Sequence, residues 1–387
     1  MMRSRWLLPL LPLAILGACA ESEVIAPLPD DASADPPPPL TGADASIDAP
    51  ADGASESEYR WVRTPIPTSG TALFDVWGSA SDDVWAVGAR GTVLHWNGKA
   101  WQVSPTGVDD TFNAVWGTGA SNVWIGASSH LMLRGGGWNA DGGGWTLTPP
   151  LTAAGKRATI WDINGTGPND VWAVGDYALV THPTLGFMTI AAWHWSGDAW
   201  KMVPVVNDFS RPGGDVQVAL RSVWPASSGD VWLGGVFGRT FRNADWSPLA
   251  PVQRAGVVGM APLPPWKEYD SASRADIERT WGTWANDVWA VGRNGVVRHW
   301  DGTSTFLWTT VDVGVHEDLH AVWGRSKDDV WVLGEGSTIV HWDGSRWTRE
   351  PTEPGLHLYE IWGNEDDVWI VGDDVILRRT KAKENTQ

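Results

Sequence analysis

Short runs of β-branched and aromatic residues alternate with polar turns along most of the chain. In residues 319–347 the order is V-W-G, then D-V-W-x-x-G, then H-W-D-G-x-x-W. Residues 320–324, 330–334 and 337–342 of this stretch predict three successive strands. The dipeptide Asp343-Gly344 is a strong hairpin signal and leads into a fourth strand at Trp347. One unit of the pattern therefore predicts four short antiparallel strands.

The unit recurs along the chain, and the tryptophan of its second run marks each copy. This tryptophan occurs seven times, at intervals of 39, 48, 60, 57, 42 and 38 residues. The seven residues are Trp85, Trp124, Trp172, Trp232, Trp289, Trp331 and Trp369. Four strands per unit of about 40 residues, with an aromatic signature in each, predict an all-β fold, a seven-bladed β-propeller of four-stranded blades.

The last copy lacks a fourth strand. The first, second, third and sixth copies end on a W-x-x-x-P strand, as in Trp347 to Pro351, whereas the seventh stops after Arg379. The same signature precedes the first copy, at Trp61 to Pro65. We therefore expect this N-terminal segment to supply the outer strand of the last blade, so that the sheet edge is covered and the ring is closed.

The N-terminus reads as an export signal. Two arginines lie in the first five residues, residues 6–16 are apolar, and Leu-Gly-Ala-Cys follows at 16–19. The last four residues resemble the lipobox of bacterial lipoproteins, in which the cysteine is lipidated. Cys19 is the chain's only cysteine. We expect residues 1–19 to be a lipoprotein signal and the exported protein to be anchored in the cell envelope, at the outer membrane or cell surface.

Residues 20–58 differ from the rest in composition. They are rich in Ala, Asp, Pro and Ser, and hold ten acidic residues without Lys or Arg. Such a segment buries too little apolar surface to fold, so it predicts a disordered tether. The propeller is expected over residues 59–380, followed by a disordered tail at 381–387. It keeps a charge of about −10 of the chain's −18, which argues against nucleic acid and against adhesion to anionic lipid.

Loop lengths indicate where a partner could bind. The link between the first two strands is nearly constant, whereas the links between blades, and between the second and third strands, vary. In an up-and-down blade these two variable links lie on the same face, and insertions tend to collect on a binding face. The long insertions fall at 176–190, 205–219 and 248–278. Candidate binding residues there are His182, Phe187, Phe209, Arg211, Arg254, Trp266, Lys267, Glu268 and Tyr269. The alternative is that Trp266 and its neighbours cover the axial opening or pack the loop onto the ring.

Two other patterns are interpreted as structural. His95, His194, His299 and His341 recur before Trp, but equivalent positions of different blades diverge from the axis and cannot meet at one ion. The Asp pairs 82–83, 328–329 and 366–367 recur at one turn, where a carboxylate usually accepts backbone N–H bonds, although calcium is an alternative. Residues 271–279 have helical character after a Ser cap. We expect no metal and no cofactor.

The layout of residues 73–101, L-x-x-V, a polar turn, V-W-A-V-G and W-N-G-x-x-W, resembles the BNR or Asp-box propellers. In particular, it is similar to the branch typified by the photosystem II assembly and stability factors. Residues 343–347 depart from the Asp-box D-x-G-x-T-W by one residue and by the missing Thr. The resemblance implies the fold and suggests an assembly factor for a membrane complex.

Sialidases share this superfamily and make an enzyme the main alternative. Their chemistry needs three arginines, a Tyr nucleophile and an acid/base pair at the axis. The innermost strands repeat V-W-G and are interpreted here as showing no unusual acid or base. We therefore expect a monomeric, non-enzymatic binding or scaffold module for a protein or glycan partner, with a sialidase-like hydrolase and a membrane-complex assembly factor as alternatives.

Overall fold

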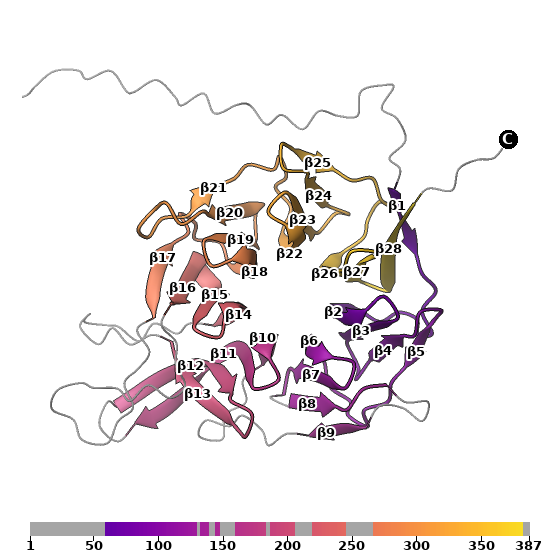
Figure 1. The fold of residues 1–387 in the computed structure, drawn as a ribbon, viewed down its shortest axis with the longest axis horizontal. Coiled ribbons are helices and arrows are strands. Elements are labelled where there is room, and N and C mark those ends of the chain that lie inside the picture. The colour runs from indigo at the N-terminus through magenta and orange to yellow at the C-terminus, as the bar shows by residue number, and fades with distance from the viewer. Residues whose placement is uncertain are drawn as a thin grey trace, which may run out of the picture. The chain divides into compact units, whose positions relative to one another are not determined.

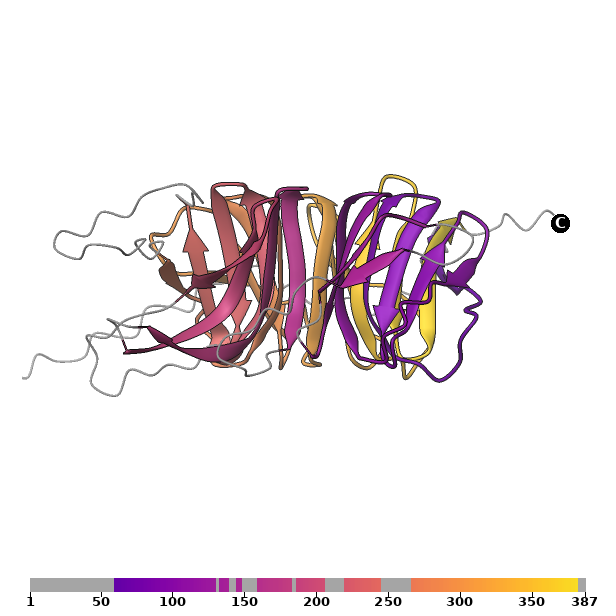
Figure 2. The ribbon, with the colours of Figure 1, turned by 90° about the horizontal axis from the view of Figure 1, so that it is seen from below.

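The computed structural model describes residues 59–129, 132–138, 144–147, 159–182, 186–205, 219–244 and 266–381. These residues form seven four-stranded antiparallel sheets, which stand side by side around a central axis (Figures 1 and 2). The predicted seven-bladed β-propeller is confirmed. No helix in these ranges is long and apolar enough to cross a membrane.

Each blade places four strands in order from the axis outward. The innermost strands are β2 (Leu73–Ala80), β6 (Phe112–Gly119), β10 (Ile160–Gly167), β14 (Leu220–Ser227), β18 (Ile277–Trp284), β22 (Leu319–Ser326) and β26 (Leu358–Gly363). The second strands are β3 (Asp83–Gly88), β7 (Asn122–Ala127), β11 (Asp170–His182), β15 (Asp230–Gly235), β19 (Asp287–Gly292), β23 (Asp329–Gly334) and β27 (Val368–Gly372).

The two outer layers are shorter in most blades. The third strands are β4 (Val93–Trp96), β8 (Met132–Gly135), β12 (Gly186–Trp195), β16 (Arg239–Asn243), β20 (Val296–Trp300), β24 (Ile339–Trp342) and β28 (Val375–Lys381). The outermost strands are β5 (Trp101–Val103), β9 (Trp145–Leu147), β13 (Trp200–Pro204), β17 (Lys267–Asp270), β21 (Thr309–Thr310), β25 (Trp347–Arg349) and β1 (Tyr59–Arg63). A short 3-10 turn, η1 (Val236–Gly238), joins β15 to β16.

The last blade is completed by β1. It pairs antiparallel with β28 from Tyr59 opposite Lys381 to Arg63 opposite Leu377, and the sheet order is β1-β28-β27-β26. The predicted closure by the N-terminal segment is confirmed. Because the two ends of the described chain share one sheet, the ring cannot open without breaking this ladder of backbone hydrogen bonds.

The seven central tryptophans form the core of the blade interfaces. Each is completely buried except Trp289, which is 5% exposed. A tryptophan in, or directly before, the next blade's outer strand meets each one edge-to-face, with ring centroids 5.1–6.0 Å apart and planes at 74–89°. The pairs are Trp85–Trp145, Trp124–Trp200, Trp172–Trp266, Trp232–Trp308, Trp289–Trp347, Trp331–Trp61 and Trp369–Trp101. This geometry is favourable for aromatic rings, so one such pair holds each blade interface together.

A cationic or imidazole side chain lies opposite each central tryptophan, on the third strand. These residues are His95, Arg134, His194, Arg242, His299, His341 and Arg378. Each forms a hydrogen bond of 2.6–2.9 Å with the polar side chain that begins the second strand or, for Asp367, directly precedes it. The histidines therefore stay within their own blades, as expected. The second Asp of each Asp pair takes this role, and its hydrogen-bond partners in the described residues are side chains. The expectation that this carboxylate accepts backbone N–H bonds is therefore wrong.

Two local expectations are wrong. Residues 271–279 contain no helix: Ala272 has a positive φ of 52°, and Ile277 starts innermost strand β18, paired with Gly292 of β19. Residues 176–190 are not mainly a loop, because β11 and β12 continue as a long hairpin as far as the pairing of His182 with Gly186. In both places pairing with a partner strand, which local sequence does not reveal, decides the structure.

Candidate functional site

The two faces of the ring carry different links, and one part of the loop-length prediction is wrong. Residues 244–266 join β16 to β17, the third and fourth strands of the fourth blade, so most of the 248–278 insertion is neither a link between blades nor a link between second and third strands. Leu73 at the start of β2 lies opposite Gly88 at the end of β3, so the blade-to-blade links and the turns between second and third strands share one face. We call this the link face. The turns between first and second strands lie on the opposite, short-turn face.

Five of the nine candidate binding residues precede residue 266 in the chain. Phe209, Arg211 and Arg254 lie outside the described residues. The backbones of His182 and Phe187 are paired near the tip of the β11–β12 hairpin, where His182 lies opposite Gly186 and Thr181 opposite Phe187. Their side chains are not described, so binding by these residues stays a prediction.

The candidates at 266–269 belong to the outer edge of the fourth blade, not to an inter-blade loop. Trp266 packs edge-to-face on Trp172, with ring centroids 6.0 Å apart, and Tyr269 on β17 is only 7% exposed. Glu268 forms an ion pair with Arg239 at 2.7 Å, and Lys267 donates to the carbonyl of Thr305 at 2.6 Å. These contacts match the alternative in which Trp266 and its neighbours pack against the ring.

A different group of charged residues lies at the axis, and sequence reasoning missed it. Each innermost strand has a bulge directly after its first residue. The seven residues that follow these bulges, the axial layer, are Asp75, Ala114, Asp162, Ser222, Arg279, Ala321 and Glu360. The four charged members line a cavity at the axis, whereas Ala114 and Ala321 pack in the core. The expectation that the innermost strands show no unusual acid or base is therefore wrong: three acids and one arginine occupy this position.

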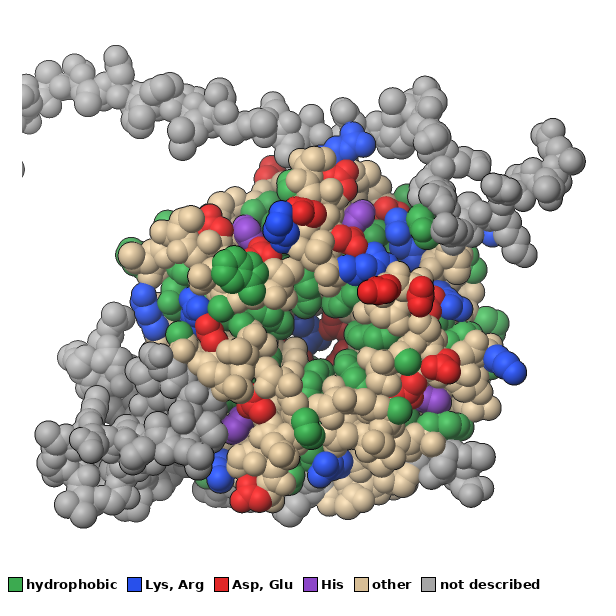
Figure 3. All heavy atoms as spheres, in the orientation of Figure 1, with side chains coloured by type: hydrophobic (Ala, Val, Ile, Leu, Met, Phe, Trp, Pro, Cys, Tyr) green, Lys and Arg blue, Asp and Glu red, His purple; other side chains and the backbone are tan. Residues whose placement is uncertain are grey.

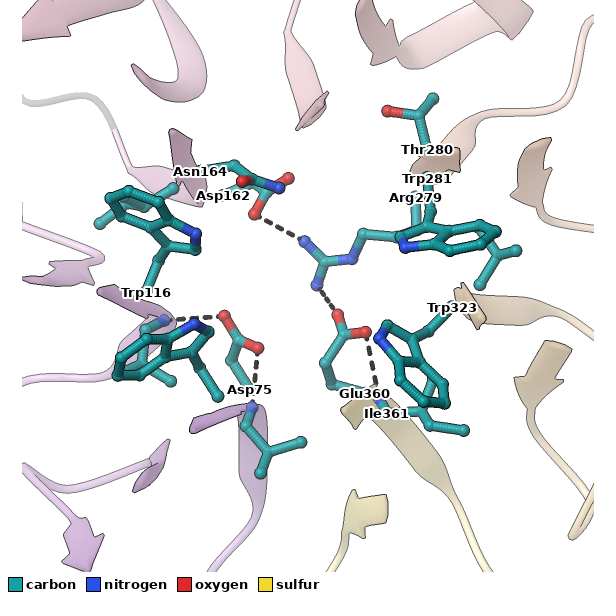
Figure 4. Close-up of a pocket in the computed structure, with 15 residues that line it drawn as sticks. Asp75, Trp116, Asp162, Asn164, Arg279, Thr280, Trp281, Trp323, Glu360 and Ile361 are labelled. Carbon is teal, nitrogen blue, oxygen red and sulfur yellow. Dashed lines mark hydrogen bonds and ion pairs between the residues drawn. The ribbon is translucent and has the colours of Figure 1, made fainter. Parts of the chain in front are cut away.

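Arg279 extends across the axis and joins three blades (Figure 4). Its Nη1 lies 2.9 Å from Oδ1 of Asp162, and its Nη2 forms an ion pair with Oε2 of Glu360. Asp162 also accepts from the backbone N–H of Val223 in the next blade, at 2.8 Å. The arginine thus links the third, fifth and seventh blades.

Asp75 is bound differently. Its Oδ1 accepts from the backbone N–H of Val76 and its Oδ2 from that of Val115 in the second blade, both at 2.7 Å. Among the residues that the structure describes, no cation forms an ion pair with Asp75. The side chain is nevertheless buried, with 6% of the residue exposed. Asp75 is therefore a buried carboxyl held by backbone donors alone.

Two of the axial carboxyls, Asp75 and Glu360, resist ionisation. Burial, and then the charge of Glu360, raise the pKa of Asp75 well above its usual value, although Arg279 opposes this. Burial raises the pKa of Glu360 to about 7, again against the effect of Arg279. The pKa of Arg279 is raised, because the nearby carboxylates outweigh its own burial. One guanidinium does not compensate three buried acids.

A cavity of about 100 Å³ lies among these side chains. Its walls include Trp77, Trp116, Trp281 and Trp323 together with the four charged residues. In Figure 3, acidic and basic side chains are visible inside the opening at the centre of the ring. The site is therefore a small polar chamber with an aromatic wall, reached along the axis.

The aromatic wall is held by contacts between neighbouring blades. A Cβ added at Gly117 would lie 2.6 Å from the ring of Trp77, and the same close approach joins Trp116 to Gly165, Trp224 to Gly282, Trp281 to Gly324, Trp323 to Gly363 and Trp362 to Gly78. The third and fourth blades differ, with Asn164 and Pro225 at the corresponding positions. The ring of tryptophans is therefore interrupted beside Asn164, which also lines the cavity.

Aromatic residues also lie one position before the axial layer, nearer the link face. Phe74 and Tyr359 have ring centroids 5.4 Å apart, and His320 lies 5.5 Å from Tyr359. On the third and fourth blades the guanidinium of Arg221 lies 4.3 Å from the centroid of Trp161. We call these five residues the link-face rim. All are partly exposed, so the link-face ends of the innermost strands offer aromatic surface to a ligand.

No group of three or more His, Cys, Asp or Glu side chains in the described ranges is arranged to hold a metal ion. The axial carboxyls are engaged by backbone N–H groups and by Arg279 instead. The chemistry available at the axis is therefore ionic and hydrogen-bonding recognition, with two carboxyls that can exchange protons.

Comparisons with known proteins support the fold. No family profile and no curated protein matches the chain. Among solved structures, it is similar to YCF48 bound to D1 peptide, with a TM-score of 0.61 and 15% identity over 89% of this chain and all of that one. YCF48 from Cyanidioschyzon merolae gives 0.60 and 20% over 84% of this chain and all of that one. Virginiamycin B lyase from Staphylococcus aureus gives 0.60 and 11% over 83% and 99%. At these identities the likeness shows the β-propeller fold alone.

Proposed function

We propose that this protein is a non-enzymatic binding propeller that holds a segment of a partner protein at the link-face end of its axis. The observation that carries the proposal is the axial layer, where the repeat gives way to Asp75, Asp162, Arg279 and Glu360. Burying charges is costly, and well-packed apolar residues usually serve stability as well or better. Alanine at the same position in the second and sixth blades, Ala114 and Ala321, indicates that the fold does not need charge there.

The size of the chamber favours a protein over a glycan. Pockets for whole small molecules are typically about 300–1,000 Å³, whereas this cavity is about 100 Å³. It has room for one side chain or a few water molecules. A peptide could insert one side chain and lay its remainder on the link-face rim. YCF48, a structural neighbour, is described as bound to a D1 peptide, which is compatible with this mode of binding.

A peptide-display selection on the immobilised full chain tests the proposal. We expect selected peptides to lose binding when the rim is changed by Tyr359→Ala and Phe74→Ala. The matched control is Trp284→Ala, which removes an aromatic side chain that is 57% exposed at a turn of the short-turn face. Peptides that ignore the rim variants but lose binding to the control variant would contradict the proposal.

We further propose that the protein is exported and held at the cell envelope by lipid on Cys19, with residues 20–58 as a tether. Labelling cells with a radioactive fatty acid should mark the wild-type protein and not Cys19→Ser. Incorporation of label into Cys19→Ser would contradict lipidation at this residue. A role in assembling a membrane complex would fit such a location and the likeness to YCF48.

A glycoside hydrolase is the second candidate, because Asp75 and Glu360 are buried acids with raised pKa values, as acid catalysts often are. The size of the cavity and the single axial arginine argue against it. A panel of fluorogenic glycosides, assayed with the wild type and with Glu360→Gln, distinguishes the hydrolase from the binding protein. Hydrolysis by the wild type that is lost in the variant would overturn the binding proposal.

A further inference from the structure

We propose that the axial cavity accepts the ammonium group of a lysine side chain presented by the partner protein. This inference rests on the proposed function and specifies what the chamber recognises. Its basis is the composition of the walls, where three carboxyls face one guanidinium, next to the rings of four tryptophans.

The charge of the axial layer is unbalanced. With all groups ionised, the three carboxylates and Arg279 carry a net charge of −2. Asp162 and Glu360 share the arginine, and Asp75 has no ion-pair partner in the described part of the chain, although it is 6% exposed and directed at the cavity (Figure 4). A second cation beside Asp75 and Glu360 would relieve the repulsion between them. An anion in the same place would be repelled by these carboxylates.

The shape and lining of the cavity select among cations. Lysine ends in a compact ammonium on a slender stem, whereas the arginine head group is broad and planar. A volume of about 100 Å³ suits the former. The faces of tryptophan rings also attract cations that come within about 6 Å. The chamber thus offers carboxylates for the charge and indole surface for the methylene groups.

The titratable side chains that line the cavity come from four innermost strands. One position nearer the link face, the innermost strands add His320, Tyr359, Arg221 and Glu278. Asp75 comes from β2, Asp162 from β10, Arg279 from β18 and Glu360 from β26, and the other three innermost strands contribute Ala114, Ser222 and Ala321. The raised pKa of Glu360 means that a proton must leave before this carboxyl pairs with an ammonium. Affinity for lysine is therefore expected to rise with pH, while the lysine itself stays protonated.

Calorimetric titration of the full chain with the blocked pentapeptide Gly-Gly-Lys-Gly-Gly, and with its norleucine counterpart, tests the inference. Only the lysine peptide should bind, and its affinity should rise by about tenfold or more between pH 6 and pH 8, since Glu360 must lose its proton and the pKa of Asp75 is raised as well. Asp75→Asn should weaken binding by about tenfold or more, and Glu360→Gln should reduce the pH dependence. The wild-type pH series needs no variant and remains informative if either variant fails to fold.

Equal behaviour of the lysine and norleucine peptides, or an affinity for lysine that does not change with pH, would overturn the lysine inference. The peptides selected by display separate the two proposals. Selected peptides that bind at the rim without needing lysine leave the proposed function standing and refute only the lysine site. A protein that selects no rim-dependent peptide refutes the proposed function itself.

Discussion

The indole of Trp331 shows how one residue of the repeat is held. It is completely buried and meets Trp61 edge-to-face at 5.7 Å. His341 stacks on it at 3.8 Å, and the guanidinium of Arg379 lies 4.7 Å from its ring. Its Nε1 donates to Asp329 at 2.8 Å. Neighbours on every side mean that no rearrangement can fill the space if this ring is removed.

We expect Trp331→Ala to lower the free energy of unfolding by about 3–5 kcal/mol, because it leaves a cavity in a close-packed interface. Trp284→Ala, at a ring that is 57% exposed, should change it by less than about 0.5 kcal/mol. Chemical denaturation of both variants measures the difference. Similar losses in the two variants would contradict the assignment of Trp331 to the core.

Arginine replaces histidine at the position of His341 in other blades, which suggests a substitution to test at this residue. His341 shares a hydrogen bond of 2.7 Å with Asp329, and this contact helps to lower the pKa of Asp329 to about 2, against the effect of burial. In the second, fourth and seventh blades an arginine stands at the same place. His341→Ala should therefore cost about 1–3 kcal/mol, and His341→Arg less than about 1 kcal/mol. Thermal melts of both variants test this, and equal destabilisation would count against interchangeable roles.

Sequence reasoning succeeded at Trp331 and failed at Arg279 for a physical reason. The tryptophan repeats in every unit, so seven copies support one another. Arg279 occurs once at its position, and the residues before it favour a helix locally; only pairing of β18 with β19 makes the segment a strand. Trp266 was missed as an outer-strand residue for a similar reason, since Asp270 stands where other copies have the signature proline. A buried charge placed by a bulge leaves no periodic signal.

At the scale of elements, β1 is the strand that pairs with the most distant part of the chain. It adds to β28 over five residue pairs and carries Trp61, which takes the same edge-to-face place on Trp331 that Trp101 takes on Trp369. In the printed sequence, Trp61 could be recognised by its motif, and this is why the closure was predictable. β1 closes the propeller both through its backbone hydrogen bonds to β28 and through the packing of the Trp61 ring on Trp331.

Trp61→Ala is expected to release β1 and to destabilise the protein by about 2–5 kcal/mol. Amide hydrogen exchange should then become fast in residues 59–63 and 375–381 while the other blades stay protected. The matched control is Trp101→Ala, at the same position of the first blade, which should leave β28 slow. Unchanged exchange in β28 of Trp61→Ala would show that the backbone ladder alone closes the ring.

At the scale of the whole molecule, the axial layer joins several blades, some of which are not neighbours. Through Arg279 it connects the third, fifth and seventh blades, and through Asp75 the first and second. Its protonation state should therefore influence the stability of the entire ring. The usual pKa of glutamic acid, 4.5, is raised to about 7 at Glu360 in the folded protein. The folded state thus binds this proton more tightly than the unfolded state.

This linkage has a definite sign. The stability contributed by Glu360 is fully present below about pH 4.5 and is lost as the pH rises through about 7. Urea unfolding at pH 5 and pH 8 should show a decline for the wild type that Glu360→Gln lacks. Glu268→Gln, at an acid that is 51% exposed, is the control and should keep the decline. The same decline in Glu360→Gln would mean that another group causes it.

The pairing of β1 with β28 also sets the order of events during synthesis. β1, which completes the ring, is the first strand to leave the ribosome. Its partner β28, residues 375–381, leaves more than 300 residues later. Contacts so distant along the chain form slowly. Until the last blade is synthesised, β1 has no sheet to join. Trp61 is then not yet held in the position where it packs on Trp331. A nascent chain that ends before residue 375 therefore carries a β1 strand without a pairing partner. We expect such termination products to be bound by chaperones or degraded by proteases.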